Sequence, residues 1–380
     1  MRVFKLNWLR QSLFRLFISA RISTILSLTF LASSSLSAQE KLSKISPQEA
    51  GYSAEKLELL KQFLKNSGTE SMLLLHDGKL LFEFGDLHQK RSVHSIRKAL
   101  LNGVYGSYLQ QQGLAPDALL HSRLSDWQMD DAPNKLNALE KQTQLQYLLQ
   151  SRSGIYLPAT AESDGMVANK PSRNSHPAGS FFYYNNWDFN AAGGIAETWS
   201  GKSIYRLFNE MIAQPIGMMD YQNKIDTLHD DQSIDPQSKL DGYYQYELEK
   251  SRFPAYHFRL SSYDLALYGQ LFLNQGEWHG KQIISKEWIK RSTTPISIIN
   301  PEYGLAYGML WNVLVPDNAD ERPSFYHTGV DIHMLGIYPK HKLVMVHRVN
   351  TEQAHTFNEA SLYKIIRMMH DARFKIPAQP

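Results

Sequence analysis

The order of strand and helix patterns along this chain constrains its fold more than any other feature. Two apolar runs, at residues 71–76 and 79–84, flank Asp77-Gly78, a strong β-hairpin signal. Four more strands are predicted near the other end, at residues 308–315, 325–328, 333–338 and 343–349, before an amphipathic helix at 357–372. The middle is mostly helical or irregular, with 221–250 read as a polar surface excursion. The pattern predicts an α/β fold of the α+β type. One central antiparallel sheet is formed by both chain ends and flanked by helices, with an inserted, mainly helical subdomain at about 106–305.

The first 38 residues have the pattern of a targeting segment. They contain five basic residues and no acidic residue, an apolar core at 22–32, and a small-residue stretch that ends at Ala38. The apolar core is too short to span a bilayer, which takes about 20 residues. We therefore expect a signal peptide at 1–38, cleaved near Ala38, and a secreted, periplasmic domain at 39–380 without stable membrane insertion after cleavage. A mitochondrial presequence and an uncleaved anchor are the alternatives.

Charge and cysteine content exclude several classes of protein. Of 40 Lys and Arg, five lie in the first 38 residues, which leaves 35 against 37 Asp and Glu. Nothing therefore predicts a nucleic acid or an anionic membrane as partner. The chain has no cysteine, which excludes disulfides and a thiol nucleophile. No His-Glu-x-x-His, Gly-x-Gly-x-x-Gly or Walker motif occurs, so we expect neither a metal nor another cofactor.

The spacing Ser-x-x-Lys occurs three times, beginning at Ser53, Ser95 and Ser361. A serine and a lysine three apart on a helix share one face. Only the copy at Ser95 precedes a run apolar enough to bury its lysine, Lys98, whose charged form burial would disfavour. A neutral amine beside a hydroxyl gives a nucleophile with its base. Ser53 is better explained as a helix N-cap, and the third lysine can face water; for Ser95 the alternative is also an N-cap with a surface lysine.

Tyr184-Asn185-Asn186 is a second candidate element, on a predicted loop. A tyrosine and an asparagine two apart can point the same way, so that Tyr184 moves a proton and Asn186 holds a substrate amide. The aromatic residues around them favour the alternative of a core segment.

His327-Thr328-Gly329 is the third candidate element, on a predicted strand. A glycine there would let a ligand approach the strand edge closely. The backbone N–H of Val330 could then donate to an oxyanion. A turn with a surface histidine is the alternative.

In this order, the three motifs are those of the serine β-lactamases and penicillin-binding proteins. The chain resembles the branch related to class C β-lactamases, which includes esterases, D-amino-acid peptidases and a hydrolase of nylon oligomers. The resemblance extends over most of residues 45–370. It includes these connecting stretches: Ser151-Arg152-Ser153-Gly154, Gly179 five residues before Tyr184, Glu197 eleven after Asn186, Pro215-Ile216-Gly217-Met218, Ser262-Tyr263-Asp264-Leu265 and 276–281.

The resemblance implies a role for each matching residue. Ser95 is expected to be the acylated nucleophile, with Lys98 as its base and Tyr184 as a second proton-transfer group. The expected substrate-binding residues are Asn186, His327, Thr328, Gly329 and Val330. The backbone N–H groups of Ser95 and Val330 would form the oxyanion hole.

Two departures from the family pattern bear on the substrate. The family usually has lysine where this chain has His327, which is mostly uncharged at neutral pH, and Asp331 follows close by. Both disfavour an anionic substrate. We therefore expect a serine hydrolase that cleaves an ester or amide bond of a small molecule through a Ser95 acyl-enzyme. A true β-lactamase or D-Ala-D-Ala carboxypeptidase, and a catalytically silent relative that binds cell-wall peptides, are the alternatives. The sequence indicates no oligomeric state.

Overall fold

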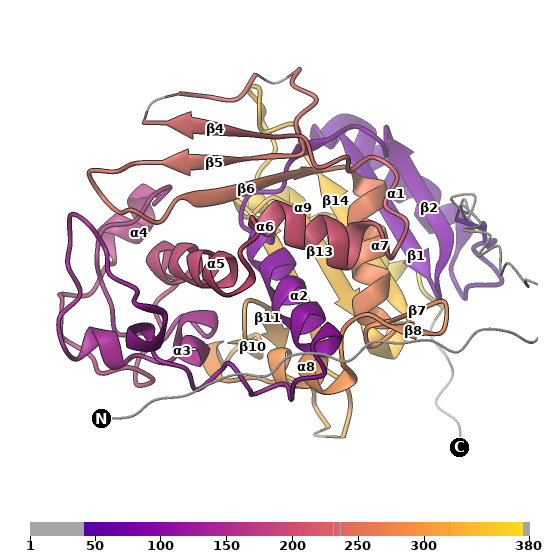
Figure 1. Ribbon diagram of the computed structural model, residues 1–380. Helices are drawn as coiled ribbons and strands as arrows, with labels where there is room; N and C mark the ends of the chain where they lie inside the picture. The colour runs from indigo at the N-terminus through magenta and orange to yellow at the C-terminus, as the bar shows by residue number, and fades with distance from the viewer. Residues whose placement is uncertain (1–41, 231, 236, 319, 375–380) are drawn as a thin grey trace, which may run out of the picture. The chain divides into compact units, whose positions relative to one another are not determined.

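The main sheet of the protein combines strands from both ends of the chain (Figure 1). The computed structural model describes residues 42–374 except 231, 236 and 319, so the predicted signal peptide lies outside the described residues. The eight strands are β1 (Ser71–His76), β2 (Lys79–Gly85), β9 (Ser297–Asn300), β10 (Leu305–Tyr307), β11 (Asn312–Leu314), β12 (Ser324–Gly329), β13 (His333–Tyr338) and β14 (Leu343–Arg348). Their order is β2-β1-β14-β13-β12-β11-β10-β9, and every pair is antiparallel. The predicted fold class is confirmed.

Local sequence signals account for the edge where the two chain ends meet. Asp77 and Gly78 both have positive φ angles, 48° and 78°, as the tight turn of a hairpin requires. This turn joins β1 to β2, which confirms the predicted hairpin. On its other side β1 pairs with β14 from Ser71↔Arg348 to His76↔Leu343. The N-terminal hairpin is thus fixed beside the C-terminal strands.

Helices cover both faces of the main sheet. Alternate residues of a strand point to opposite faces. Leu73 and Leu75 of β1 join the core that contains α2 (Ile96–Gln111) and α7 (Ser262–Leu273). Met72 and Leu74 join a second core with α1 (Ala54–Ser67) and α9 (Glu359–Asp371). Burying one leucine stabilises the fold by about 1.5–3 kcal/mol, so this alternation specifies the register of β1.

The middle of the chain contains a second sheet that the sequence did not indicate. Its strands are β3 (Arg91–Ser92), β4 (Ile225–His229), β5 (Gly242–Tyr246) and β6 (Ala255–Leu260), in the order β3-β6-β5-β4. The interpretation of 221–250 as a polar excursion was therefore wrong. These strands are short, and β4 has no buried residue and β5 only two, so they lack a continuous apolar pattern.

The predicted strand at 308–315 is only partly confirmed, because β11 covers Asn312–Leu314 and residues 308–311 form a turn. The chain turns between β10 and β11, where Leu310 has a φ of 61° and its N–H donates to the Leu149 carbonyl. Residues of this turn are buried, Met309, Leu310 and Trp311 among them. An apolar, buried turn has the composition of a strand, which hid it in the sequence.

The other elements connect these sheets. The helices are α3 (Leu145–Leu149), α4 (Asp164–Ala168), α5 (Asn186–Ser200), α6 (Ile204–Phe208) and α8 (Lys286–Ser292). The short helical turns are η1 (Leu124–Trp127), η2 (Glu140–Gln142), η3 (Asn209–Ala213) and η4 (Pro339–His341), and β7 (Glu277–Trp278) pairs with β8 (Lys281–Gln282). Among the residues described, no helix is long and apolar enough to cross a membrane.

Candidate active site

Ser95 lies at the start of α2, next to a buried lysine. Its hydroxyl makes no capping hydrogen bond to the helix. Instead, Ser95 Oγ and Lys98 Nζ are hydrogen-bonded at 2.8 Å, and Lys98 is only 1% exposed. The alternative of an N-cap serine with a surface lysine is therefore wrong. By contrast, Ser53 caps α1 by accepting from the Lys56 N–H, and Lys364 of the third copy is exposed.

The surroundings of Lys98 favour an unprotonated amine. Its Nζ lies 4.6 Å from the ring centre of Tyr184 and 4.8 Å from that of Phe189. Burial in these surroundings lowers the pKa of Lys98 well below its usual value, and the charge of Arg97 lowers it further, whereas Asp331 acts in the opposite direction. An unprotonated amine can accept the proton of the Ser95 hydroxyl.

Tyr184 faces the same serine from the segment before α5. Burial raises the pKa of Tyr184, and a hydrogen bond with Ser95 offsets part of that rise. The neighbouring Tyr183 points elsewhere, because its hydroxyl donates to the Met166 carbonyl at 2.6 Å. The structure thus brings Tyr184, and not Tyr183, to the nucleophile.

Asn186 is placed differently from the other predicted residues. It is the first residue of α5 rather than part of a loop, so the predicted loop ends earlier than expected. Its Nδ2 donates to the Ala161 carbonyl, and its buried Oδ1 has no hydrogen-bond partner within the described residues. The preceding Asn185 caps the helix by accepting from the Trp187 N–H. The structure therefore shows Asn186 buried at the start of α5, without a hydrogen bond to Ser95 or Lys98.

His327 is a buried, neutral residue of β12. Its Nδ1 is hydrogen-bonded to the Thr328 carbonyl at 2.8 Å. A carbonyl only accepts, so Nδ1 carries the proton and Nε2 keeps a free lone pair. Burial and the nearby Lys98 lower the pKa of His327 to about 3. The alternative of a surface histidine in a turn is wrong, and the position offers no positive charge to a substrate.

Gly329 brings the end of β12 against the residues that precede Ser95. A Cβ built on Gly329 would lie 2.5 Å from the Val93 carbonyl oxygen and 3.2 Å from the His94 Cβ. On the side where a Cβ would stand, Gly329 is therefore in contact with the chain itself. The glycine is needed because it lets β12 approach the start of α2.

Two backbone N–H groups at this junction are candidates for an oxyanion hole. Val330 and Asp331 form a tight turn after β12, with φ angles of 43° and 60°, and the side chain of Val330 is 52% exposed. For the described part of the chain, no hydrogen bond uses the backbone N–H of Ser95 or Val330. Such N–H groups can stabilise the negative charge of a tetrahedral intermediate. Thr328 lies beside them, and its hydroxyl donates to Asp331 at 3.4 Å.

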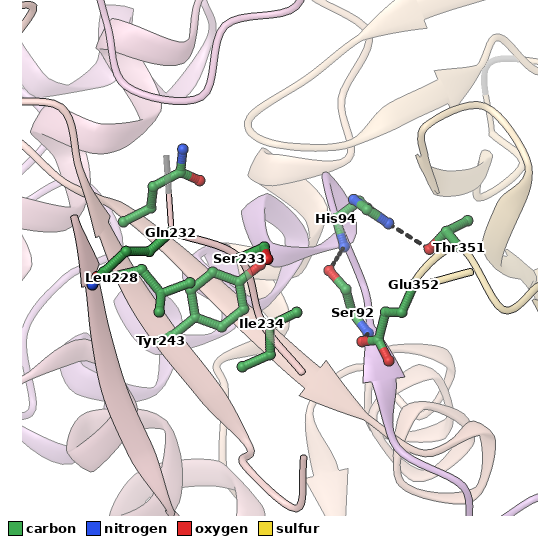
Figure 2. A pocket seen from close by; sticks show the side chains of 10 residues that line it. Ser92, His94, Leu228, Gln232, Ser233, Ile234, Tyr243, Thr351 and Glu352 are labelled. Carbon is green, nitrogen blue, oxygen red and sulfur yellow. Dashed lines mark hydrogen bonds between the residues drawn. The ribbon is translucent and has the colours of Figure 1, made fainter. Parts of the chain in front are cut away.

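Sequence reasoning missed a cavity whose lining includes His94, the residue before Ser95 in the sequence. It has a volume of about 430 Å³, and its far side is lined by Leu228, Gln232, Ser233 and Ile234 (Figure 2). Its lining includes His94, Tyr243 and Glu352, and His94 Nε2 is hydrogen-bonded to Thr351 Oγ1 at 2.7 Å. The cavity depends on β5, which the sequence did not reveal. In the residues described, no group of three or more acidic or histidine side chains could hold a metal ion.

The fold and the site together define a β-lactamase-like hydrolase. A model of the beta-lactamase family matches residues 74–366. The chain belongs to this family, whose members are serine hydrolases.

Three solved structures illustrate the similarity. A Bacillus anthracis protein described as a 6-aminohexanoate-dimer hydrolase is 20% identical, with 87% of each chain covered and a TM-score of 0.61. A Bacteroides dorei protein described as a beta-lactamase is 16% identical over 84% of this chain and 99% of the other, with a TM-score of 0.62. EstCE1, described as a hydrolase with promiscuous acyltransferase activity, is 14% identical over 85% and 99%, with a TM-score of 0.58. At these identities the matches show the fold alone. No curated protein matches the chain.

Proposed function

We propose that this protein hydrolyses an ester or amide bond of a small molecule through an acyl-enzyme on Ser95. The observation that carries the proposal is the 2.8 Å hydrogen bond between Ser95 Oγ and the buried amine of Lys98. A hydroxyl is a weak nucleophile unless a base removes its proton. A buried amine, whose pKa is lowered, supplies that base at neutral pH.

Acylation follows from the positions of three side chains. Ser95 Oγ adds to the substrate carbonyl while its proton passes to Lys98 Nζ. The N–H groups of Ser95 and Val330 donate to the resulting oxyanion. When the intermediate collapses, the bond to the leaving alcohol or amine breaks, and Tyr184 relays the proton from Lys98 to that group.

Deacylation reverses these roles with water as the attacking group. Lys98 and Tyr184 take a proton from the water as it adds to the acyl carbonyl. The bond to Ser95 Oγ then breaks, and the serine recovers its proton as the acid leaves. No step needs a metal or another cofactor.

The neutral His327 supports an uncharged substrate over an anionic one. A lysine at this position would attract a substrate carboxylate, but a histidine with a pKa near 3 carries no charge at neutral pH. Ester and uncharged amide substrates fit this site better than a β-lactam, which bears a carboxylate. The names of two structural neighbours, a 6-aminohexanoate-dimer hydrolase and a hydrolase with promiscuous acyltransferase activity, support hydrolysis of an ester or amide bond but give no preference for an uncharged substrate.

The test compares the chain with its Ser95→Ala variant on a chromogenic short-chain ester and a chromogenic cephalosporin. We expect turnover of the ester to fall by at least about 10³-fold in the variant, and the ester to be preferred over the cephalosporin. Ser53→Ala and Ser361→Ala are matched controls, because each removes the serine of another Ser-x-x-Lys copy. Equal turnover by the wild type and Ser95→Ala would contradict the proposal.

Location is a separate proposal, based on residues 1–38 alone. We propose that the protein is exported to the periplasm and cleaved near Ala38. The mass of the chain recovered from the periplasmic fraction should then lack these residues, and recovery of the uncleaved chain from the cytoplasm would contradict export.

A further inference from the structure

Arg97 lies between the nucleophile and its base in the sequence, and its side chain is buried. It is 2% exposed. Its Nη2 donates to Asn190 Oδ1 at 2.9 Å, and its Cζ lies 4.4 Å from the ring centre of Tyr256. The remaining Nη1 is buried without a hydrogen-bond partner among the described residues. The guanidinium is therefore fixed in one place by an amide and an aromatic face.

No carboxylate among the described residues neutralises this guanidinium. Throughout the described part of the chain, no ion pair within 4.0 Å includes Arg97. Another buried arginine, Arg259, has the usual arrangement, with Glu352 at 2.8 Å. Because arginine stays protonated in proteins, the first turn of α2 carries a buried positive charge that is not paired with any of the described carboxylates.

Arg97 and Lys98 are held against the same turn of α5. Arg97 bonds to Asn190, and the amine of Lys98 lies 4.8 Å from the ring centre of Phe189, the preceding residue. Two positive charges held against neighbouring residues in an interior of low dielectric repel each other, and the charge of Arg97 accordingly lowers the pKa of Lys98. Since the guanidinium keeps its proton, the amine is the group that loses one.

We propose that Arg97 is a positioning residue that keeps the amine of Lys98 unprotonated, and so ready to accept the proton of Ser95, by holding an uncompensated positive charge beside it. This inference rests on the proposed function, because it concerns the base of the same reaction. Arg97 does not touch the substrate.

Other groups that face Lys98 do not replace this effect. The tyrosine and histidine side chains near Lys98 are neutral at physiological pH, because burial raises the pKa of the tyrosine and lowers the pKa of each histidine. They are Tyr184, His327, His94 just before α2, and His257 of β6. Asp331 raises the pKa of Lys98, but it acts less strongly than Arg97 and is exposed to water, which screens it. The balance at the amine is therefore set by burial and by Arg97.

The charge of Lys98 can be followed directly by NMR, without any substrate. The full chain is produced with ¹³C,¹⁵N-lysine, and the Lys98 signal is assigned with Lys98→Met. Its titration is then recorded in the wild type, in Arg97→Gln, which removes the charge, and in Arg97→Lys, which keeps it. A further variant, Asn190→Asp, retains Arg97 and places a carboxylate within hydrogen-bond distance of it. Asn66→Asp, on the exposed face of α1, is the control for an equal change in net charge.

We expect the titration midpoint of Lys98 to rise by on the order of one pH unit in Arg97→Gln and in Asn190→Asp. Arg97→Lys and Asn66→Asp should leave it in place. A fluorophosphonate should label Ser95 more slowly at acid pH, where Lys98 is protonated. The pH at which this labelling rate falls should rise together with the titration midpoint of Lys98. If Arg97→Gln does not fold, the titration midpoint of Lys98 in Asn190→Asp alone tests the inference.

An unchanged Lys98 midpoint in a folded Arg97→Gln and in Asn190→Asp would overturn the inference. The NMR readout also separates this inference from the proposed function. A chain that labels at Ser95 but shows no shift contradicts only the role of Arg97. A chain that shows the shift but never labels supports the charge effect and contradicts the proposed reaction.

Discussion

Substitution of Gly329 tests whether the contact between β12 and the start of α2 positions the site. A Cβ at this residue would lie 2.5 Å from the Val93 carbonyl oxygen, whereas an ordinary contact begins at about 3.4 Å. The obstructing atom belongs to the backbone, so it cannot rotate away as a side chain could. Gly329→Ala must therefore move β12 and the segment before Ser95 apart by roughly 0.9 Å, the difference between these distances.

The displacement separates the two N–H groups proposed to bind the oxyanion, those of Ser95 and Val330. A misplacement of about 1 Å can reduce a rate about 10²-fold, and the loss of one oxyanion donor costs about 10²–10³-fold. The same overlap should lower the free energy of unfolding by about 1–3 kcal/mol. We therefore expect kcat on the chromogenic ester to fall by about 10²-fold or more, while the variant still folds.

The assay measures kcat, KM and the thermal unfolding midpoint of Gly329→Ala beside a matched control. Gly165→Ala is that control, because Gly165 lies in α4 with only Ser163 Oγ near its Cβ position, at 4.0 Å. It should leave the rate unchanged and keep or raise the midpoint. Wild-type kcat in a folded Gly329→Ala would refute the reasoning that this contact places the oxyanion donors.

Two further predictions follow from particular side chains. Tyr184→Phe should slow Ser95 labelling by about 10²–10⁴-fold, whereas Tyr183→Phe, whose hydroxyl is bonded to Met166, should change it by only a few-fold; equal effects would contradict the assignment of Tyr184. Burial lowers the pKa of His347 from 6.5 to about 4. As the pH falls, His347 therefore becomes protonated in the unfolded chain before it does in the folded protein. The free energy of unfolding should therefore decrease between about pH 6.5 and 4, by roughly 3 kcal/mol from this residue. Urea titrations of the wild type and His347→Gln at several pH values should show a flatter dependence in the variant, and parallel curves would contradict it.

The parts of the fold that the sequence predicted correctly carry strong local signals. Asp77-Gly78 specifies a turn with positive φ angles, and the apolar run after Ser95 predicted a helix that could bury its lysine. A buried Lys98 was therefore one of the two arrangements that the sequence offered before any tertiary contact was known. The antiparallel sheet from both chain ends followed from the strand patterns in the same way.

The parts that could not be predicted depend on contacts between distant residues. Burial of Arg97 requires Asn190 and Tyr256, from α5 and β6, and a charged residue in an apolar helix gives no sign of such partners. The close contact of Gly329 with Val93 could not be predicted either, because only the folded chain brings these two segments together. The second sheet was missed because β4 and β5 lack the apolar alternation of a half-buried strand.

The most direct test of the central claim is the mass of the protein during turnover of a slow ester substrate. Acid quenching should trap a species heavier than the free chain by one acyl group, and peptide mapping should place that group on Ser95. The same experiment on Ser95→Ala should show only the unmodified mass. An acyl group on another residue would contradict the Ser95 acyl-enzyme. So would turnover at equal rates in the wild type and Ser95→Ala with no acylated species in the wild type.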